Sequence, residues 1–496
     1  MAEKPNMPAW SVRGARPWGL AAAVAALLVV VLLPSPAGLP VAGQNMLGIL
    51  AFAVILWMTE ALDYAVSAVL ISALMAFLVG LSPNPAKPGQ FLGTGPALTM
   101  ALGGFANTAL ALVAAALFLA AAMQVTGLDR RIALVVLSRM GARTNRVVVG
   151  AILTGTVMAF FVPSTTARVA CLVPITLGMI HAFGAGQKSR LAALLMITTV
   201  QTASIWNVGI KTAAAQNLVM IGFAEKILGA TVTWLDWFIA AAPWAILMSV
   251  GLYFVMTWML PPETSEIAGG AQAVAAELKK LGPPKPAEIK LMAIAVILLA
   301  FWATEGVLHP FDSSTTTVAA IAIMFLPGIG IMDWKTAQAK IPWGTILLFG
   351  VGIGLGTALL NTQAAGWLAG IVVSQLGLQL AAPLTVLAVL AAFLIVIHLG
   401  FASATALASS IIPIVIGVLQ HVQTPGIHVL GMTLLLQFVV SFGFILPVNA
   451  PQNMVAYGTD TFTSRDFIRT GLVLTALGYA LLLILSATYW RWLGYT

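Results

Sequence analysis

The sequence predicts an all-α polytopic membrane protein with about 11 transmembrane helices and two re-entrant helical hairpins, arranged as an inverted repeat. Of its 496 residues, 60% are hydrophobic and 8% are charged, and the mean hydropathy is +1.01. Apolar runs of about 20 residues, long enough to cross the hydrocarbon core as a helix, recur from end to end. The runs are continuous, which excludes the alternating pattern of a membrane β-barrel.

The charged residues predict how the chain is oriented. The net charge of +8 is spread over short loops, so the positive-inside rule explains it better than nucleic-acid binding. Lys4, Arg13 and Arg16 precede a first apolar run of full spanning length, which indicates a retained helix. We expect an integral protein of the bacterial inner membrane, with its N-terminus in the cytoplasm and its C-terminus outside. The single cysteine, Cys171, excludes a disulfide framework.

Four segments are expected. Residues 1–42 form an N-terminal segment with the first helix, and residues 43–260 form the first inverted repeat. Residues 261–289, rich in Lys and Pro, form a cytoplasmic linker, and residues 290–496 form the second inverted repeat. The apolar segment 147–185 is broken by polar residues at its middle and is followed by Lys188 and Arg190. A re-entrant hairpin keeps those cations inside, whereas a single crossing would place them outside.

Three motifs occur twice, in the same order. Trp57-x-Thr59-Glu60 returns as Trp302-x-Thr304-Glu305, and Gln216-Asn217 returns as Gln452-Asn453. The pattern S-x-T-A-x6-P-I begins at Ser164 and again at Ser403. Equivalent helices are separated by an odd number of predicted spans, so the two halves are expected to be inverted. Inverted repeats with broken helices are typical of secondary transporters that bind substrate near the middle of the membrane.

The repeated polar breaks predict a binding site for a small divalent anion. Helix N-termini at hairpin tips and broken helices carry N–H groups that suit an anion. The side chains expected to bind substrate are the tip hydroxyls and the broken-helix amides: Ser164, Thr165, Thr166, Ser403, Thr405, Asn217 and Asn453. Exposed carbonyls near Ser164 and Thr405 would suit Na+ as a coupling ion. The alternative is that such hydroxyls only pack helices together and bond to backbone.

Two cations fall at membrane depth. Arg168 follows the first tip and Lys211 lies in the first broken helix. A buried cation costs roughly 2.5–3.5 kcal/mol on insertion scales and is a functional candidate by default. We expect both to compensate negative charge, and a fixed arginine could supply the charge that bound Na+ supplies in a symporter. The alternative for Arg168 is a side chain that extends to the cytoplasmic surface.

The remaining polar residues have simpler interpretations. Glu60, Asp63 and Glu305 could relay protons, but for Glu60 and Glu305 local pairing at helix ends is the favoured interpretation. The histidines show no metal-ligand spacing, and only His398 lies close to a tip. The alternating glycines of residues 350–356 favour close helix packing over a nucleotide loop.

These motifs resemble the divalent anion/sodium symporter family, the INDY-type dicarboxylate transporters, over nearly the whole chain. The family carries Ser-Asn-Thr at each tip, and Ser164, Thr166, Ser403 and Thr405 match its outer positions. Asn217 and Asn453 match its broken-helix asparagines. Thr126-Gly127-Leu128 followed by Arg130 and Arg131 adds to the resemblance. It implies a homodimer in which a transport domain moves against a scaffold in an elevator motion.

The departures from the family pattern indicate exchange. The middle asparagine is Thr165 in one tip and Ala404 in the other, and Thr166-Ala167-Arg168 resembles the sodium-independent exchangers of the family. The predicted function is therefore transport of C4-dicarboxylate-like anions, with exchange preferred. Na+-coupled symport of dicarboxylate or sulfate is the runner-up, and an anion channel is the alternative of another class. An integral-membrane enzyme is the least favoured class, because the sequence places no nucleophile–base pair or metal cluster at membrane depth.

Overall fold

The computed structural model describes residues 16–84, 87, 89–140, 143–182, 184–263 and 270–496, so Lys4 and Arg13 lie outside the described residues. Within these ranges the regular elements are helices, and ten of them are long and apolar enough to cross a membrane. Six shorter apolar helices accompany them. The predicted fold class is confirmed, whereas the exact number of spans and the re-entrance of the hairpins stay predictions.

The first half of the described chain contains these helices: α1 (Pro17–Leu32), α2 (Val41–Thr59), α3 (Tyr64–Leu74) with a π-helical turn (Met75–Val79), α4 (Thr94–Leu102), α5 (Thr108–Thr126), α6 (Leu128–Leu137), α7 (Thr144–Phe161), α8 (Thr165–Ala182), α9 (Arg190–Gly209), a 3₁₀ turn (Lys211–Ala213), α10 (Ala215–Phe223) with a π-helical turn (Ala224–Leu228), and α11 (Trp234–Met259). The linker carries α12 (Gly270–Lys280).

The second half continues with these helices: α13 (Pro286–Thr304), α14 (Ser313–Met324), α15 (Trp334–Lys340), α16 (Trp343–Asn361), α17 (Ala364–Gln375), α18 (Pro383–His398), α19 (Ala404–His421), α20 (Val429–Val440), a 3₁₀ turn (Pro447–Asn449), α21 (Pro451–Tyr457), α22 (Ser464–Ala487) and α23 (Tyr489–Trp492). The expected polar breaks are present in both halves: α8 and α19 each follow a short tip, and α9–α10 and α20–α21 are each interrupted.

Some helices differ from those expected. The apolar run over residues 97–126, long enough for one spanning helix, forms two: α4 ends at Leu102 and the Asn107 side chain caps a new helix, α5, by accepting from Ala109 N. The arginine-rich stretch after α5 folds as α6, and the predicted linker contains a helix, α12. Leu128, Ile132 and other apolar residues on one face of α6 are buried, which gives this short helix a tertiary partner that propensity alone does not reveal.

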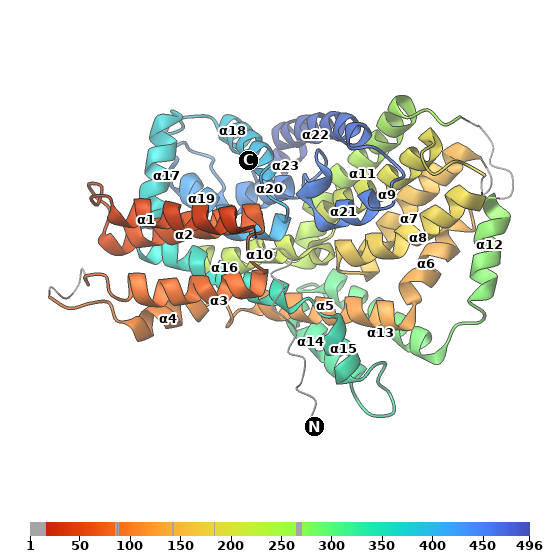
Figure 1. Cartoon of the computed structure of the whole chain (residues 1–496), viewed down its shortest axis with the longest axis horizontal. Coiled ribbons are helices and arrows are strands. Elements are labelled where there is room, and N and C mark those ends of the chain that lie inside the picture. The colour runs from red at the N-terminus through yellow and green to blue at the C-terminus, as the bar shows by residue number, and fades with distance from the viewer. Residues whose placement is uncertain (1–15, 85–86, 88, 141–142, 183, 264–269) are drawn as a thin grey trace, which may run out of the picture.

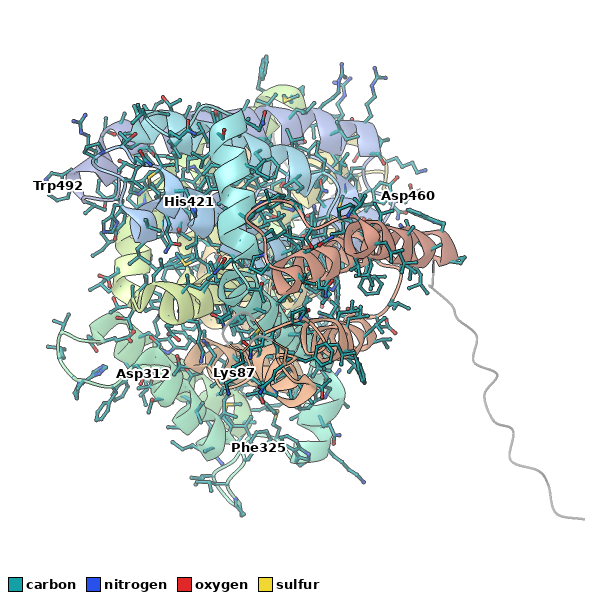
Figure 2. All side chains as sticks on the ribbon, turned by 90° about the vertical axis from the view of Figure 1, so that its left-hand side faces the viewer. Lys87, Asp312, Phe325, His421, Asp460 and Trp492 are labelled. Atoms are coloured by element: carbon teal, nitrogen blue, oxygen red, sulfur yellow. The ribbon has the colours of Figure 1, made fainter. Side chains whose placement is uncertain are left out.

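One helix of the first half is enclosed by its neighbours. Helix α9 is buried along its whole length and packs against α7, α8 and α11 (Figure 1). On the other side, α1 packs against α2, and α16 packs against α3, α4 and α19. Helix α12 stands at the edge of the molecule beside α6 and α8. Asp312, which caps the start of α14, and Asp460, which follows α21, lie at the periphery (Figure 2).

Repeat-related residues make matching contacts. Trp57 Nε1 donates to Ser67 Oγ at 3.1 Å, and its counterpart Trp302 Nε1 donates to Thr317 Oγ1 at 3.0 Å. Each bond ties the end of one helix to the next helix along the chain, α2 to α3 and α13 to α14. The neighbouring Glu305 accepts from Ser313 and Trp234, which agrees with local pairing at a helix end.

The glycines of residues 350–356 lie inside α16 and allow neighbouring backbones to approach it. A Cβ at Gly354 would lie 2.1 Å from Ala101 O, and one at Gly352 would lie 2.6 Å from Ser409 Cβ. A side chain at either position would therefore overlap α4 or α19. The packing interpretation of this run is confirmed, since small residues permit close helix approach in membranes.

We expect Gly354→Ala to lower the midpoint of thermal unfolding in detergent, because the nearest atoms to the new methyl group belong to backbone and must shift. Overpacking of this kind costs about 1–3 kcal/mol. Gly370→Ala in α17 is the matched control, because no atom lies within 4 Å of its Cβ position. Equal midpoints for the two variants would contradict the packing role of Gly354.

Candidate functional site

A cavity of about 500 Å³ lies where the two tips and the two broken helices meet. The first tip is residues 162–166 and the second tip is residues 399–405. The first break is residues 210–214 and the second break is residues 441–450. The lining from these four segments and their following helices includes Ser164, Thr165, Thr166, Ser403, Ala404, Thr405, Ala214, Ala215, Gln216, Ala450, Pro451 and Gln452. The structure therefore brings the five predicted hydroxyl residues together.

Several helices begin at this cavity. Helices α8, α10 and α19 start at Thr165, Ala215 and Ala404, and the short α21 also starts there. The first N–H groups of a helix have no partner within the helix, and the helix dipole makes this end positive. Among the described residues that line the cavity, none is Asp or Glu. The arrangement therefore favours a bound anion.

The tip hydroxyls hold the tips in shape. Ser164 Oγ accepts from Ala167 N at 3.3 Å, and Ser403 Oγ accepts from Ala406 N at 3.3 Å. These equivalent bonds cap the first turns of α8 and α19 and leave the earlier N–H groups of each helix for a ligand. Thr165 Oγ1 donates to Asn207 Oδ1 at 2.6 Å, so this hydroxyl also ties the first tip to α9.

Asn217 and Asn453 stabilise the breaks and do not line the cavity. Asn217 Nδ2 donates to the carbonyls of Asn207 (2.6 Å) and Ile210 (3.1 Å). In the second repeat, Asn453 Nδ2 donates to Gly443 O (2.9 Å) and Leu446 O (3.3 Å) at the same sequence separations. These amides satisfy carbonyls that the interrupted helices leave open. Their nitrogens, which we expected to donate to substrate, are used by the backbone in this structure.

The two halves also exchange equivalent contacts. Gln216 Nε2 in the first repeat donates to Ser441 Oγ in the second at 3.2 Å. Its counterpart Gln452 Nε2 in the second repeat donates to Ser204 Oγ in the first at 3.5 Å. Reciprocal contacts of this kind are what a two-fold relation between repeats produces. Both glutamines begin their helices at the cavity.

Arg168 lies behind the first tip, fully buried, and does not line the cavity. Its guanidinium donates to Val162 O (2.9 Å), Ala213 O (3.0 Å), Ala203 O (3.4 Å) and Asn207 Oδ1 (2.6 Å). The bonds join the first tip, the first break and α9 at one point. Because the guanidinium is held by backbone at this depth, the alternative of a side chain extending to the surface does not describe this structure.

The second tip has a similar group of carbonyls, but there the carbonyls accept hydrogen bonds from a neutral side chain. Asn449 Nδ2 donates to His398 O (2.8 Å), Phe401 O (3.1 Å) and Leu399 O (3.3 Å). Phe401 holds the repeat position of Val162, whose carbonyl accepts from Arg168. The His398 imidazole is buried beneath this tip, and both of its ring nitrogens lack a partner in the described part of the chain. Sequence reasoning did not single out Asn449.

Lys211 is buried in the first break but lies outside the cavity lining. Its Nζ donates to Val232 O at 2.7 Å, next to the start of α11. Its carbonyl accepts from Asn217 Nδ2 at 3.4 Å. The structure therefore uses Lys211 to hold the residues that precede α11, and it does not bring this cation to the lining of the cavity.

Further polar residues that sequence reasoning missed line the cavity, among them Tyr64, Gln124 and Lys340. The Tyr64 hydroxyl is buried beside the Ser403 side chain and makes no hydrogen bond of normal geometry with a described residue, so it can donate to a ligand. Lys340 ends α15 and is exposed at the cavity margin. They come from α3, α5 and α15, far from the repeated motifs, and only the folded chain shows that they are close.

Comparison with known proteins identifies the family. The model described as the sodium:sulfate symporter transmembrane region matches residues 15–496. A "membrane protein" of Cupriavidus necator is 58% identical over 479 residues, covering 96% of this chain and 93% of that protein. The L-tartrate/succinate antiporter of Escherichia coli K12 is 25% identical over 484 residues, covering 95% of this chain and 97% of that protein.

Two solved structures share the fold. The YdaH transporter of Alcanivorax borkumensis has a TM-score of 0.55 at 17% identity, covering 88% of this chain and 99% of that chain. MtrF of Neisseria gonorrhoeae, described as an antimetabolite efflux pump, has a TM-score of 0.53 at 15% identity, covering 93% and 97%. With the family model spanning the chain, these findings confirm a transporter rather than an enzyme. The chain belongs to the sodium:sulfate symporter family, the divalent anion/sodium symporters.

Proposed function

We propose that this transporter exchanges small divalent anions of the C4-dicarboxylate type across the bacterial inner membrane. The observation that carries the proposal is one cavity at which α8, α10 and α19 begin and which tip hydroxyls line. A dicarboxylate can place one carboxylate against each tip, so its two charges meet two sets of N–H donors. The absence of Asp and Glu from the described lining leaves the anion without a like charge beside it.

The contacts of Arg168 and Asn449 support exchange without Na+. Both groups of tip carbonyls, which would suit a cation, are occupied by N–H donors of the chain itself. Neither group fits a Na+ ion while these side chains are in place, because an ion and an N–H donor compete for the same oxygens. Arg168 keeps a permanent positive charge beside the first tip, which supports its role as charge compensation.

The comparisons support the same proposal. The E. coli relative is named an antiporter for L-tartrate and succinate, two C4-dicarboxylates. The elevator motion, the homodimer, a cytoplasmic N-terminus and an outside C-terminus are parts of the proposal that rest on the family resemblance and the charge distribution. Na+-coupled symport of dicarboxylate or sulfate is the second candidate, favoured by the description of the family model.

Uptake of labelled succinate into proteoliposomes tests the proposal. We expect uptake to require unlabelled dicarboxylate inside and to be the same in Na+ and K+ buffers, because Arg168 supplies the charge. Uptake that needs a Na+ gradient and ignores internal anion would establish symport instead. Uptake of sulfate but not succinate in any of these conditions would contradict the substrate class.

We expect Tyr64→Phe to raise the KM for dicarboxylate by roughly threefold to tenfold, because the variant removes only a hydroxyl that makes no hydrogen bond of normal geometry with a described residue. A neutral hydrogen bond contributes about 0.5–1.5 kcal/mol. Tyr479→Phe is the matched control, since the Tyr479 hydroxyl donates to Ala388 O and does not line the cavity. An unchanged KM in Tyr64→Phe would place the substrate elsewhere.

Arg168→Ala is expected to lower exchange at least about tenfold at equal protein level, because it removes the buried charge and leaves several carbonyls without donors. Hydrogen bonds to charged groups contribute about 1.5–3 kcal/mol each, and about 1.4 kcal/mol corresponds to a factor of ten. The exposed Arg190→Ala is the control for net charge. Wild-type exchange in Arg168→Ala would refute charge compensation by this residue.

A further inference from the structure

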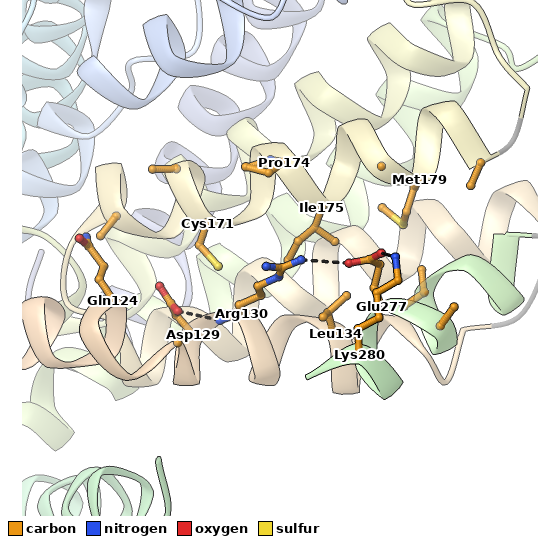
Figure 3. A pocket seen from close by; sticks show the side chains of 17 residues that line it. Gln124, Asp129, Arg130, Leu134, Cys171, Pro174, Ile175, Met179, Glu277 and Lys280 are labelled. Atoms are coloured by element: carbon orange, nitrogen blue, oxygen red, sulfur yellow. Dashed lines mark hydrogen bonds and ion pairs between the residues drawn. The ribbon is translucent and has the colours of Figure 1, made fainter. Parts of the chain in front are cut away.

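A second cavity, of about 930 Å³, adjoins the first. Helices α6, α8 and α12 form its walls, and Gln124, Ala167 and Ala170 line both cavities (Figure 3). The second cavity therefore lies next to the proposed substrate site, on the face of the protein that carries the linker. We call this the linker face; the charge distribution predicts that it is cytoplasmic. A substrate that leaves or enters by this face would pass α12.

Three charged residues of this second cavity, Arg130, Glu277 and Lys280, are paired with one another. Arg130 Nη2 donates to Glu277 Oε2 at 3.0 Å, and Lys280 Nζ donates to Glu277 Oε1 at 2.5 Å. Asp129 also lines the cavity, and burial raises the pKa of its carboxyl. Two cations thus face two acidic residues, so Arg130 offers positive charge to an incoming anion only when it leaves Glu277.

The Arg130–Glu277 ion pair is weak enough for another carboxylate to replace Glu277. Its side chains are 51% and 39% exposed, and exposed pairs contribute only about 0.2–1 kcal/mol. The neighbouring pair is different: Arg131 and Glu288 are 12% and 5% exposed, and Arg131 Nη1 also donates to Gly282 O at 3.0 Å. Arg131 therefore fixes the end of the linker to α6, and Arg130 is not needed for that task.

We infer that Arg130 is the docking residue for the substrate carboxylate on the linker face, and that Glu277 is an internal competitor that substrate displaces. Glu277 presents to Arg130 the same group that a dicarboxylate would present. Arg130 is thus a specificity-determining residue for carboxylates at entry from one face. This inference rests on the proposed dicarboxylate exchange.

The test is the KM for labelled succinate in inside-out and right-side-out membrane vesicles preloaded with unlabelled succinate. Arg130→Gln is expected to raise the KM about fivefold in inside-out vesicles, which expose the linker face, and to leave it unchanged in the others. Glu277→Gln is expected to lower the inside-out KM by a similar factor, because the competitor is gone. The double variant is expected to behave like Arg130→Gln, since Glu277 acts through Arg130.

The opposite signs separate docking from a structural latch. If the ion pair only held α12 in place, both single variants would break it and shift the KM in the same direction, which would overturn the inference. Lys279→Gln, which removes the same charge from α12 outside the cavity lining, is the control. If Lys279→Gln changed the inside-out KM as much as Arg130→Gln does, Arg130 would act only as a general surface charge. That result would also overturn the inference. Wild-type vesicles that exchange no dicarboxylate would instead refute the proposed function.

Discussion

The backbone at four interruptions must find hydrogen-bond partners inside an apolar bundle, and the rest of the site depends on how it does so. A peptide group without a partner at such depth costs several kcal/mol, so an unsupported break would not persist. Asn217 and Asn453 satisfy the carbonyls of the two breaks from equivalent positions. Because the breaks are held open, the following helices begin at the cavity and present their free N–H groups there.

The two halves carry equivalent tip carbonyls, but different side chains donate to them. Val162 and Phe401 hold equivalent positions, and the carbonyl of each accepts a side-chain N–H. The donor is the charged Arg168 from the hairpin helix in one case and the neutral Asn449 from the second break in the other. Matching carbonyl contacts at the two tips therefore coexist with a difference in charge. One tip therefore has a fixed positive charge beside it, whereas the other tip is held by a neutral amide.

The linker contributes a helix outside the two repeated halves. Helix α12 has no counterpart in the repeat plan, yet it packs on α6 and α8 and forms a wall of the cavity that adjoins the site. Two adjacent arginines on α6 have separate tasks because they differ in burial. Arg131 is enclosed with Glu288 and holds the linker, whereas Arg130 remains half-exposed with Glu277 and can change partner.

The sequence by itself determined the fold class, the repeated motifs and the tip residues. Long apolar runs directly indicate helices that lie in lipid. Motifs repeated at the same spacing indicate segments with the same backbone structure. The hydroxyls of Ser164, Thr166, Ser403 and Thr405 could be placed together for that reason. What only the tertiary structure decided was which donors each polar group uses. Asn217 and Asn453 serve the backbone, and Lys211 bonds away from the cavity.

The sequence also could not predict which residues from distant segments lie together. Tyr64 and Gln124 reach the cavity from helices without repeated motifs, and Asn449 is recognised only by the carbonyls around it. The amphipathic α6 and α12 are short and become stable through packing on other helices. Their place in the molecule depends on long-range contacts, which a pattern within one segment does not contain.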